Sequence, residues 1–519
     1  MIGKLLEERA MLHPARTFGR FHDGAQITSW TWAEANLNAG KAASALAALG
    51  IRERSVVGIA LPNSALYVAI IFGASRLGAV ITGINPGLTG AGLHHVVGTA
   101  RPQLLICDEK IAGLLAPEYN EIGEVEGFGV KSIVVRRREE VPTHYVGLVR
   151  LEDMDCLAHE LASPRADAEF AITFTSGTTG RSKGVLSSYA QLDAQVRQSL
   201  VPVTTAADTW LVDLPLFHVG GLMGLYMPLA TGCSFATVPR ISISNYWKWV
   251  DQLSATHAFV LPSVARMLLS APESPADSRH SLNYAFMAPV IGDIGIWQRR
   301  FGVQRTGTGY NSTEISAPIH RLHVPADDYR WSGKAREGVE IRLVDENGVD
   351  VQDGTRGRML VRTHDRAELN LGYIGMPEET AAAWLDGWFR TGDAFERDSE
   401  GRYFFVGRVN DFIRRRGENI SAFEVEAELL RYPGIRDCAV FGVPSPLEDE
   451  EVKAVLVTDQ VGFDIEGLVE FLRGRLPRFM VPRFIDLVTE LPQTVTGRAD
   501  KTALRALGDG GAWDLSSYR

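Results

Sequence analysis

A loop rich in glycine, serine and threonine is the stretch of this chain best suited to holding an anion. Residues 175–185 read Thr-Ser-Gly-Thr-Thr-Gly-Arg-Ser-Lys-Gly-Val and follow the apolar run 170–174, which is typical of a buried strand. Its three glycines let the backbone approach an anion closely, its hydroxyls donate hydrogen bonds, and Lys183 supplies a positive charge. The pattern predicts a polyphosphate site made by Thr175, Ser176, Gly177, Thr178, Thr179, Gly180 and Lys183.

The spacing of this loop differs from that of two common nucleotide motifs. A Walker A loop needs a glycine–lysine pair followed by serine or threonine, whereas Lys183 lies between Ser182 and Gly184. A dinucleotide fingerprint is disfavoured as well, because the glycines at 307 and 309 lack a third glycine and a strand–helix context. The remaining alternative is a flexible surface loop with a solvated lysine, a composition common in surface connections.

Length, charge and cysteine content limit the class of protein. The chain has 519 residues, enough for three or four domains or subdomains. Its 63 acidic and 53 basic residues give a formal charge of −10, which argues against broad binding to nucleic acid or to anionic membranes. The four cysteines have no metal-type spacing, and a chain of this size does not depend on disulfides, which favours a reducing cytoplasm.

No export signal and no stable membrane insertion are expected. Charged residues occupy the N-terminal positions where a signal peptide needs an apolar region. The most apolar segment, residues 66–84, is interrupted by Arg76 and three glycines, and is typical of a core helix followed by a strand. The sequence leaves open whether the protein forms a homodimer.

Alternating strands and helices must position the predicted phosphate loop. We expect Asn63 to cap a helix that continues through Leu77. The other expected helices are 35–49 and about 190–200, and the expected strands are 56–61, 79–84, 103–107, 132–135, 170–174 and 209–214. This order predicts a parallel sheet with helices on its faces.

The last third of the chain has a different pattern. Short strands at 339–344, 358–361 and 403–406, separated by Gly/Asp turns, predict a compact β subdomain. Further on, Ser421 and Glu424 form a capping-box pattern that opens a helix to Tyr432. Strands at 437–441 and 452–457 and a helix at 465–475 complete a unit of about a hundred residues, with a boundary near 408–411.

Six further motifs follow the same order along the chain as in a known superfamily. They occupy residues 215–220, 310–314, 387–393, 407–411, 416–420 and 492–501. With the phosphate loop, they resemble the adenylate-forming (AMP-binding) superfamily of acyl-CoA synthetases, luciferases and nonribosomal-peptide adenylation domains, over nearly the whole chain. The resemblance implies an α/β fold with a large N-terminal domain (1–408) of two Rossmann-like parallel-sheet subdomains plus a β-barrel subdomain. A small mobile α+β C-terminal domain (409–519) would follow.

The resemblance also implies a two-step ligase reaction that needs ATP, Mg²⁺ and coenzyme A. A small-molecule carboxylic acid is joined to the α-phosphate of ATP with release of pyrophosphate, and its acyl group then passes to a thiol. The loop with Lys183 would hold the β and γ phosphates, Thr313 would contact phosphate, and Glu314 would be the magnesium-associated carboxylate.

The motifs also contain most of the residues that the resemblance assigns to the nucleotide site. The resemblance implies that Tyr310 and Asn311 lie at the adenine, with Ala288 and Pro289 bordering it. Asp393 would accept hydrogen bonds from the ribose hydroxyls, and Arg408 would reach the nucleotide.

On the thiol side, His218 would be the gate between the carboxylate site and the pantetheine channel. Gly417 would belong to the loop that, in the ligases this chain resembles, turns toward coenzyme A. Taken singly, each of these residues in the nucleotide and thiol sites has an ordinary structural alternative, such as a cap, a core aromatic residue or an ion-pair partner.

Several positions depart from the pattern of the superfamily. Arg498 stands where the catalytic lysine is usual, so we expect Arg498 to aid adenylation, with Lys501 as a secondary candidate. Phe286 and Met287 replace two glycines that commonly border the acyl pocket. The two side chains could be ordinary core packing. If one of them faces the cavity instead, it shortens the acyl pocket, and we expect a preference for a compact aromatic or short to medium aliphatic acid.

Two alternatives to a free-standing acid:CoA ligase remain. One is a catalytically impaired nucleotide-binding homologue, and the other is an adenylating enzyme that loads a carrier protein in trans. Asn311 and the overall layout also resemble carnitine/crotonobetaine-type CoA ligases, a likeness that by itself does not identify the acid.

Overall fold

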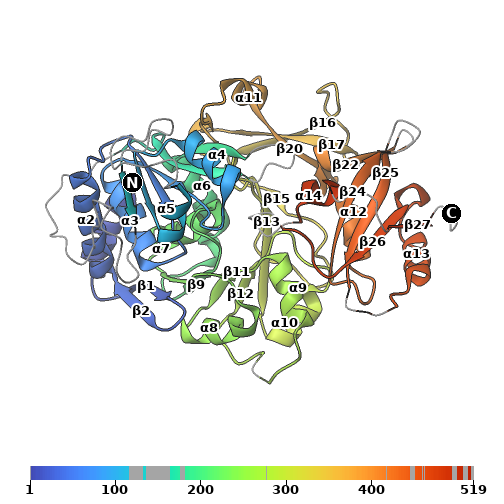
Figure 1. Cartoon of the computed structure of the whole chain (residues 1–519), viewed down its shortest axis with the longest axis horizontal. Coiled ribbons are helices and arrows are strands. Elements are labelled where there is room, and N and C mark those ends of the chain that lie inside the picture. Colours follow the sequence, from blue (N-terminus) through green and yellow to red (C-terminus); the bar gives the residue numbers. More distant parts are fainter. Residues whose placement is uncertain are drawn as a thin grey trace.

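The computed structural model describes residues 2–115, 132–135, 164–175, 182–275, 277–415, 418–444, 450–458, 460, 462–493, 499–506 and 512–515. Figure 1 shows a large N-terminal part, coloured blue to yellow, and a smaller C-terminal part in orange and red on the opposite side of the view. An antiparallel sheet at the top of the view lies between them. The predicted domain boundary after residue 408 stays a prediction.

A seven-stranded sheet carries the hairpin β7–β8, whose strands flank the predicted phosphate loop. Its order is β18-β8-β7-β4-β3-β5-β6. The strands are β3 (Val56–Ala60), β4 (Val80–Gly83), β5 (Leu104–Cys107), β6 (Ser132–Val135), β7 (Glu169–Thr175), β8 (Lys183–Ser188) and β18 (Gly372–Tyr373). The pairings from β7 through β6 are parallel, which confirms the parallel arrangement that the sequence predicts there. β8 and β18 are added antiparallel at one edge.

A nine-stranded sheet carries the strands β12 and β13, which lead to residues predicted for the nucleotide site. Its order is β15-β14-β13-β12-β11-β9-β10-β1-β2. The strands are β1 (Thr17–His22), β2 (Ile27–Thr31), β9 (Thr209–Val212), β10 (Ser234–Thr237), β11 (His257–Phe259), β12 (Tyr284–Phe286), β13 (Arg305–Tyr310), β14 (Ile319–Arg321) and β15 (Lys334–Ala335). The strands from β1 to β13 along this order are parallel, so the ends of β11, β12 and β13 meet at one edge.

Helices cover both large sheets. They are α1 (Ile2–Leu12), α2 (Trp32–Ala48), α3 (Ala65–Arg76), α4 (Gly90–Ala100), α5 (Glu109–Leu115), α6 (Tyr189–Ser199), α7 (Val219–Thr231), α8 (Tyr246–Gln252), α9 (Pro262–Ser270) and α10 (Ile294–Phe301). The main core lies between the two sheets and includes the fully buried Trp32, Phe72 and Trp210. None of the helices within the described residues is long and apolar enough to cross a membrane.

Asn63 does not cap a helix, contrary to the prediction. Ser64 is the cap of α3, and its hydroxyl accepts a hydrogen bond from the Tyr67 amide at 3.2 Å. The buried Asn63 side chain instead donates to the Leu214 carbonyl at 3.0 Å and accepts from the Leu216 amide at 2.8 Å. A sequence pattern sees only the local capping option, whereas the folded chain uses Asn63 to hold the segment before His218.

A third, antiparallel sheet joins the large part to the small one. Its strands are β16 (Val339–Val344), β17 (Arg356–Thr363), β19 (Trp384–Leu385), β20 (Trp388–Arg397) and β21 (Tyr403–Arg408). The order is β16-β17-β20-β19, and β21 also pairs with β20. A short helix, α11 (Pro377–Ala382), precedes β19. The predicted β subdomain is present, and its closure into a barrel stays a prediction.

The C-terminal part is an α+β unit with its own core. It contains a hairpin of β22 (Phe412–Arg415) and β23 (Glu418–Ser421), and a sheet of β24 (Asp437–Pro444), β25 (Glu450–Val457), β26 (Phe484–Val488) and β27 (Trp513–Asp514). Its helices are α12 (Ala422–Leu429), α13 (Ile465–Arg473) and α14 (Lys501–Ala506). Ser421 caps α12 as predicted, but the Glu424 carboxylate pairs with Arg356 of the third sheet at 2.6 Å.

Candidate active site

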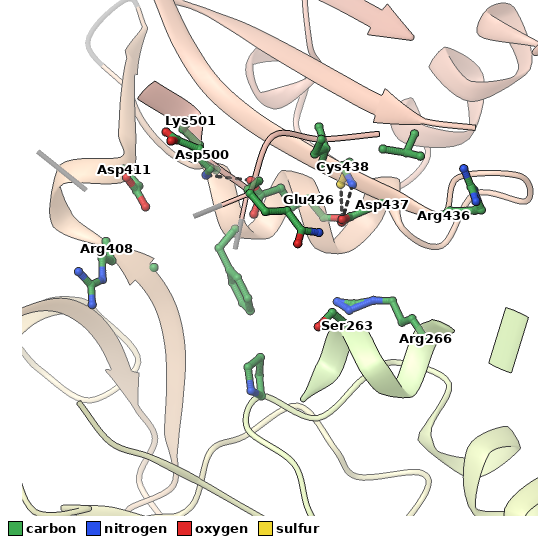
Figure 2. Close-up of a pocket in the computed structure, with 18 of the residues that line it drawn as sticks. Ser263, Arg266, Arg408, Asp411, Glu426, Arg436, Asp437, Cys438, Asp500 and Lys501 are labelled. Atoms are coloured by element: carbon green, nitrogen blue, oxygen red, sulfur yellow. Dashed lines mark hydrogen bonds and ion pairs between the residues drawn. The ribbon is translucent and has the colours of Figure 1, made fainter. Parts of the chain in front are cut away.

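A cavity of about 1240 Å³ lies between the large part and the C-terminal unit. Figure 2 shows Ser263 and Arg266 of α9 on one side, facing Glu426, Asp437 and Cys438 on the other. Seven residues predicted for the site line this cavity: Ala288, Pro289, Tyr310, Asn311, Asp393, Arg408 and Lys501. They come from distant parts of the sequence: five lie at or just after the ends of strands, Asp393 lies within β20, and Lys501 begins α14.

Asp393 is the centre of a polar group on the wall of the large part. It lies in β20, opposite Arg408 of β21, with Arg408 Nε 3.3 Å from Asp393 Oδ1. The hydroxyl of Tyr310, at the end of β13, donates to Asp393 Oδ2. Burial and the nearby Asp393 carboxylate raise the pKa of Tyr310 well above its ordinary value, so the hydroxyl stays protonated as a donor. The carboxylate is only 3% exposed and still borders the cavity.

Lys183 and Glu314 are connected through a residue that the sequence analysis missed. The Lys183 ammonium lies 4.8 Å from the centre of the Tyr373 ring, a cation–π contact. The Tyr373 hydroxyl donates to Glu314 Oε1 at 3.2 Å, and the Ser312 hydroxyl donates to Glu314 Oε2 at 3.0 Å. Tyr373 belongs to β18, which is paired with β8, and no motif marks it in the sequence.

Side chains from two other parts of the chain bind the backbone of the segment that carries Glu314. The Gln191 side chain of α6 donates to the Thr313 carbonyl at 2.9 Å, and the Asn370 side chain donates to the Glu314 carbonyl at 2.9 Å. Asn311 accepts from the Ala317 amide at 2.9 Å, and its amide nitrogen lies 3.5 Å from Met223 Sδ. The turn after β13 is therefore held in place by side chains from other parts of the chain and by Asn311 itself.

Part of the predicted site lies outside the described residues. Thr175 ends β7, where it is paired with Lys183 and its hydroxyl donates to the Lys183 carbonyl at 3.4 Å. The predicted residues that are not described are Ser176, Gly177, Thr178, Thr179, Gly180, Gly417 and Arg498.

His218 borders a second cavity, of about 550 Å³, on the large part. It directly precedes α7, and its ring lies 4.7 Å from that of Phe217. The same cavity is lined by His95 of α4 and by Ser182, just before Lys183. His218 therefore shares this cavity with Ser182, the residue directly before the strand that begins at Lys183.

Two family patterns match this chain. That of the AMP-binding enzyme family covers residues 6–373, and that of the AMP-binding enzyme C-terminal domain covers residues 424–498. The chain belongs to the AMP-binding enzyme family. Its relatives place it in the AMP-forming acid:CoA ligase branch.

Known proteins similar to this AMP-binding enzyme match it over most of its length. The crotonobetaine/carnitine–CoA ligase of Salmonella typhimurium is 27% identical over 492 residues, covering 92% of this chain and 93% of the relative. The anthranilate CoA ligase AuaEII in complex with anthranoyl-AMP has a TM-score of 0.86 at 24% identity, covering 98% and 96% of the two chains. ATP-bound MatB from Rhodopseudomonas palustris has a TM-score of 0.81 at 25% identity, covering 98% and 99%.

In this AMP-binding enzyme, Lys501 is engaged within the C-terminal unit. Its ammonium lies 2.8 Å from Glu426 Oε1, which also accepts from the Val440 amide at 2.8 Å. Figure 2 shows the Lys501–Glu426 contact on the C-terminal wall of the cavity. Burial raises the pKa of Glu426, and the Lys501 charge partly offsets this effect.

The two bulky residues before Ala288 have different surroundings. Met287 is fully buried in the core formed with α8, α9 and α10, so it is core packing. Phe286 is half-buried and contacts Phe259, with ring centres 6.0 Å apart. A Cβ atom built on Gly309, which lines the large cavity, would lie 3.4 Å from Phe286 Cζ. Phe286 is thus the one of the pair that lies beside the cavity wall.

The donor set fits magnesium bound together with a nucleotide. Within the described residues there is no cluster of three or more His, Cys, Asp or Glu side chains that could hold a metal ion by itself. Mg²⁺ commonly binds one or two carboxylates, several waters and the substrate phosphates. Glu314, on the turn after β13, provides such a single carboxylate.

Proposed function

We propose that this enzyme joins a compact aromatic or short to medium aliphatic carboxylic acid to coenzyme A, through an acyl-adenylate. The observation that carries the proposal is the Tyr310–Asp393–Arg408 group on the wall of the large cavity, opposite the C-terminal unit. A buried carboxylate with both neighbours in place is a ready acceptor for two ribose hydroxyls.

In the first step, a carboxylate oxygen of the acid attacks the α-phosphorus of ATP. The bond between the α-phosphorus and the bridging oxygen breaks, and pyrophosphate leaves. Lys183, Thr175 and the loop residues 176–180 hold the departing phosphates, and Thr313 contacts phosphate. Glu314 would hold Mg²⁺, which would supply positive charge beside the phosphate oxygens.

The nucleotide is held by the wall of the large part. Tyr310, Ala288, Pro289 and Asn311 border the adenine, and Asp393 accepts from the ribose. Arg408 adds a positive charge at the same place. Because Asp393 already orients Tyr310 and Arg408, little ordering remains for ATP to impose on them.

In the second step, the thiol of coenzyme A attacks the acyl carbon and AMP leaves. His218 gates the passage between the acid and the thiol, and Gly417 belongs to the coenzyme A site. The neighbourhood of His218 and the phosphate hairpin in the second cavity supports this role.

Phe286 supports the preference for a compact acid. Its ring approaches Gly309, which lines the large cavity, and in this proposal a smaller residue at position 286 would leave space for a longer acyl chain. The similarity to an anthranilate CoA ligase agrees with an aromatic substrate. The expected result of a carboxylic-acid panel is faster turnover on benzoate-sized or short acids than on palmitate. Faster turnover on palmitate would overturn the preference.

Arg498 aids adenylation in this proposal, and Lys501 is secondary. The ion pair between Lys501 and Glu426 supports this order, because a lysine held inside its own unit is less available to the reacting carboxylate. Arg498→Ala should lower ATP–pyrophosphate exchange more than Lys501→Ala does. If Lys501→Ala abolishes exchange while Arg498→Ala leaves it intact, the two roles are reversed.

The deciding experiment measures pyrophosphate release with ATP, Mg²⁺ and the acid panel, with and without coenzyme A. The proposal expects acid-dependent release and a thioester product when coenzyme A is present. ATP binding without acid-dependent release would identify a catalytically impaired homologue. Adenylate formation without transfer to coenzyme A, but with transfer to a carrier protein, would identify the carrier-loading alternative.

A further inference from the structure

His95 of α4 makes a contact that no motif accounts for. Its Nε2 atom lies 2.7 Å from the main-chain oxygen of Ser182. A carbonyl oxygen only accepts, so Nε2 carries the proton and donates. The contact joins a helix of the first sheet to the residue directly before Lys183, and both side chains border the second cavity.

The same short segment is fixed at further points. The Ser182 hydroxyl donates to the Thr175 carbonyl, and the Thr175 hydroxyl donates to the Lys183 carbonyl. Thr175 and Lys183 are also paired across β7 and β8. These contacts all arise within the hairpin, whereas the His95 contact comes from a separate helix, α4. It holds the peptide between Ser182 and Lys183 against α4.

We infer that His95 is a positioning residue that sets the direction of Lys183 toward the ATP phosphates. The inference rests on the proposed function, in which Lys183 holds those phosphates. The Lys183 ammonium lies over the Tyr373 ring, whose hydroxyl reaches Glu314. The orientation of the peptide group between Ser182 and Lys183 therefore sets the position of the Lys183 ammonium relative to the Glu314 carboxylate. Without the His95 donor, the Ser182 peptide loses its attachment to α4 and is held by the hairpin alone, so the ammonium loses part of that alignment.

Substitution of His95 separates this role from a general effect on folding. His95→Leu removes the donor, and we expect KM for ATP in pyrophosphate exchange to rise about tenfold, the effect of one lost hydrogen bond to a partly buried group. KM for the acid should stay within about twofold. His95→Gln keeps an amide donor at a similar reach and should restore KM for ATP to within about twofold to threefold of wild type.

Two further variants serve as controls. His95→Asn is polar but too short to reach Ser182, so it should show the same rise in KM for ATP as His95→Leu, and it substitutes for that variant if the apolar change prevents folding. Thr99→Ala changes a half-buried residue one turn further along α4 and should leave KM for ATP unchanged.

The outcomes distinguish this inference from the proposed function. If wild-type enzyme shows acid-dependent exchange and His95→Leu leaves KM for ATP unchanged, the inference is wrong and the function stands. Equal impairment by His95→Leu and His95→Gln, or an equal rise in KM for the acid, would also overturn it. If wild-type enzyme shows no exchange with any acid, the proposed function itself fails.

Discussion

Two aspartates of the large part are almost equally buried and have opposite surroundings. Asp393 is 3% exposed and receives the Tyr310 hydroxyl and the Arg408 guanidinium at the cavity wall. Asp213 is 4% exposed and directly follows β9, and neither of its carboxyl oxygens has a hydrogen bond to another described residue. Burial raises the pKa of Asp213 to about 7.

The difference teaches that burial alone does not make a binding carboxylate. Taking an ionised group out of water is costly unless partners replace the lost solvation, and an unpaired group takes up a proton instead. Asp213 also lies near the buried Tyr246 hydroxyl, whose pKa is raised by burial and by Asp213. Asp393 has a cation and a donor in place, and so is the aspartate equipped to bind a ligand as an anion.

Of the substitutions that test the difference between the two aspartates, Asp393→Asn should have the largest effect. The amide keeps one acceptor but loses the charge that pairs with Arg408 and the second acceptor for ribose. We expect ATP affinity, measured by titration calorimetry, to fall about a hundredfold, since charge-assisted hydrogen bonds are the strong ones. Asp398→Asn, in the exposed turn after β20, is the matched control and should stay within about twofold. Equal effects of the two variants would contradict the role of Asp393.

Asp213→Asn should have its effect on stability, and only at higher pH. The folded-state pKa of about 7 exceeds the ordinary value of 3.8, so the folded state binds more protons between these values. The wild-type protein therefore loses stability as the pH rises from about 4 through about 7.

The Asp213→Asn variant has no titratable group at this position and therefore does not lose stability in this way as the pH rises. At pH 8 it should be more stable than wild type by about 2 kcal/mol, and the difference should shrink toward pH 5. Urea unfolding at both pH values measures the two free energies of unfolding. A difference that does not change with pH would mean that Asp213 is not protonated in the folded protein.

Tyr310→Phe tests one partner of Asp393 while keeping the aromatic ring. The lost hydroxyl is a single hydrogen bond of about 1 kcal/mol, so KM for ATP in pyrophosphate exchange should rise about fivefold. The effect should nearly disappear when Asp393 is already Asn, because the two changes remove one shared contact. Additive effects in the double variant would show that the hydroxyl acts independently of Asp393.

Arg408→Lys should give the smallest change. The side chain is 36% exposed, and a lysine keeps the positive charge but not the planar guanidinium that faces Asp393. We expect KM for ATP to rise about twofold to threefold, because a partly exposed ion pair contributes little. A loss as large as that of Asp393→Asn would make Arg408, not Asp393, the main nucleotide contact of this wall.

Local sequence patterns predicted helices and strands well where the burial of one face or the residues of one turn determine the element. The strand at 339–344 is found with the predicted bounds. Ser421 caps α12, the helix that begins at the next residue, as predicted. Hydrophobic periodicity and turn residues act within a few positions, so such features need no distant contact. Asn63 shows the limit, because a good local cap was used for hydrogen bonds to residues about 150 positions away.

The sequence by itself determined the family, the order of its motifs and the identity of most candidate residues. Motif types and spacings carry this information, because glycines, a lysine and carboxylates are needed whatever surrounds them. Only the tertiary structure decided which partners those residues have. It joined Lys183 to Glu314 through Tyr373, brought His95 to Ser182, and paired Lys501 with Glu426. The charge state of a buried carboxyl depends on such partners, which is why Asp393 and Asp213 differ in the folded protein although they are the same residue in the sequence.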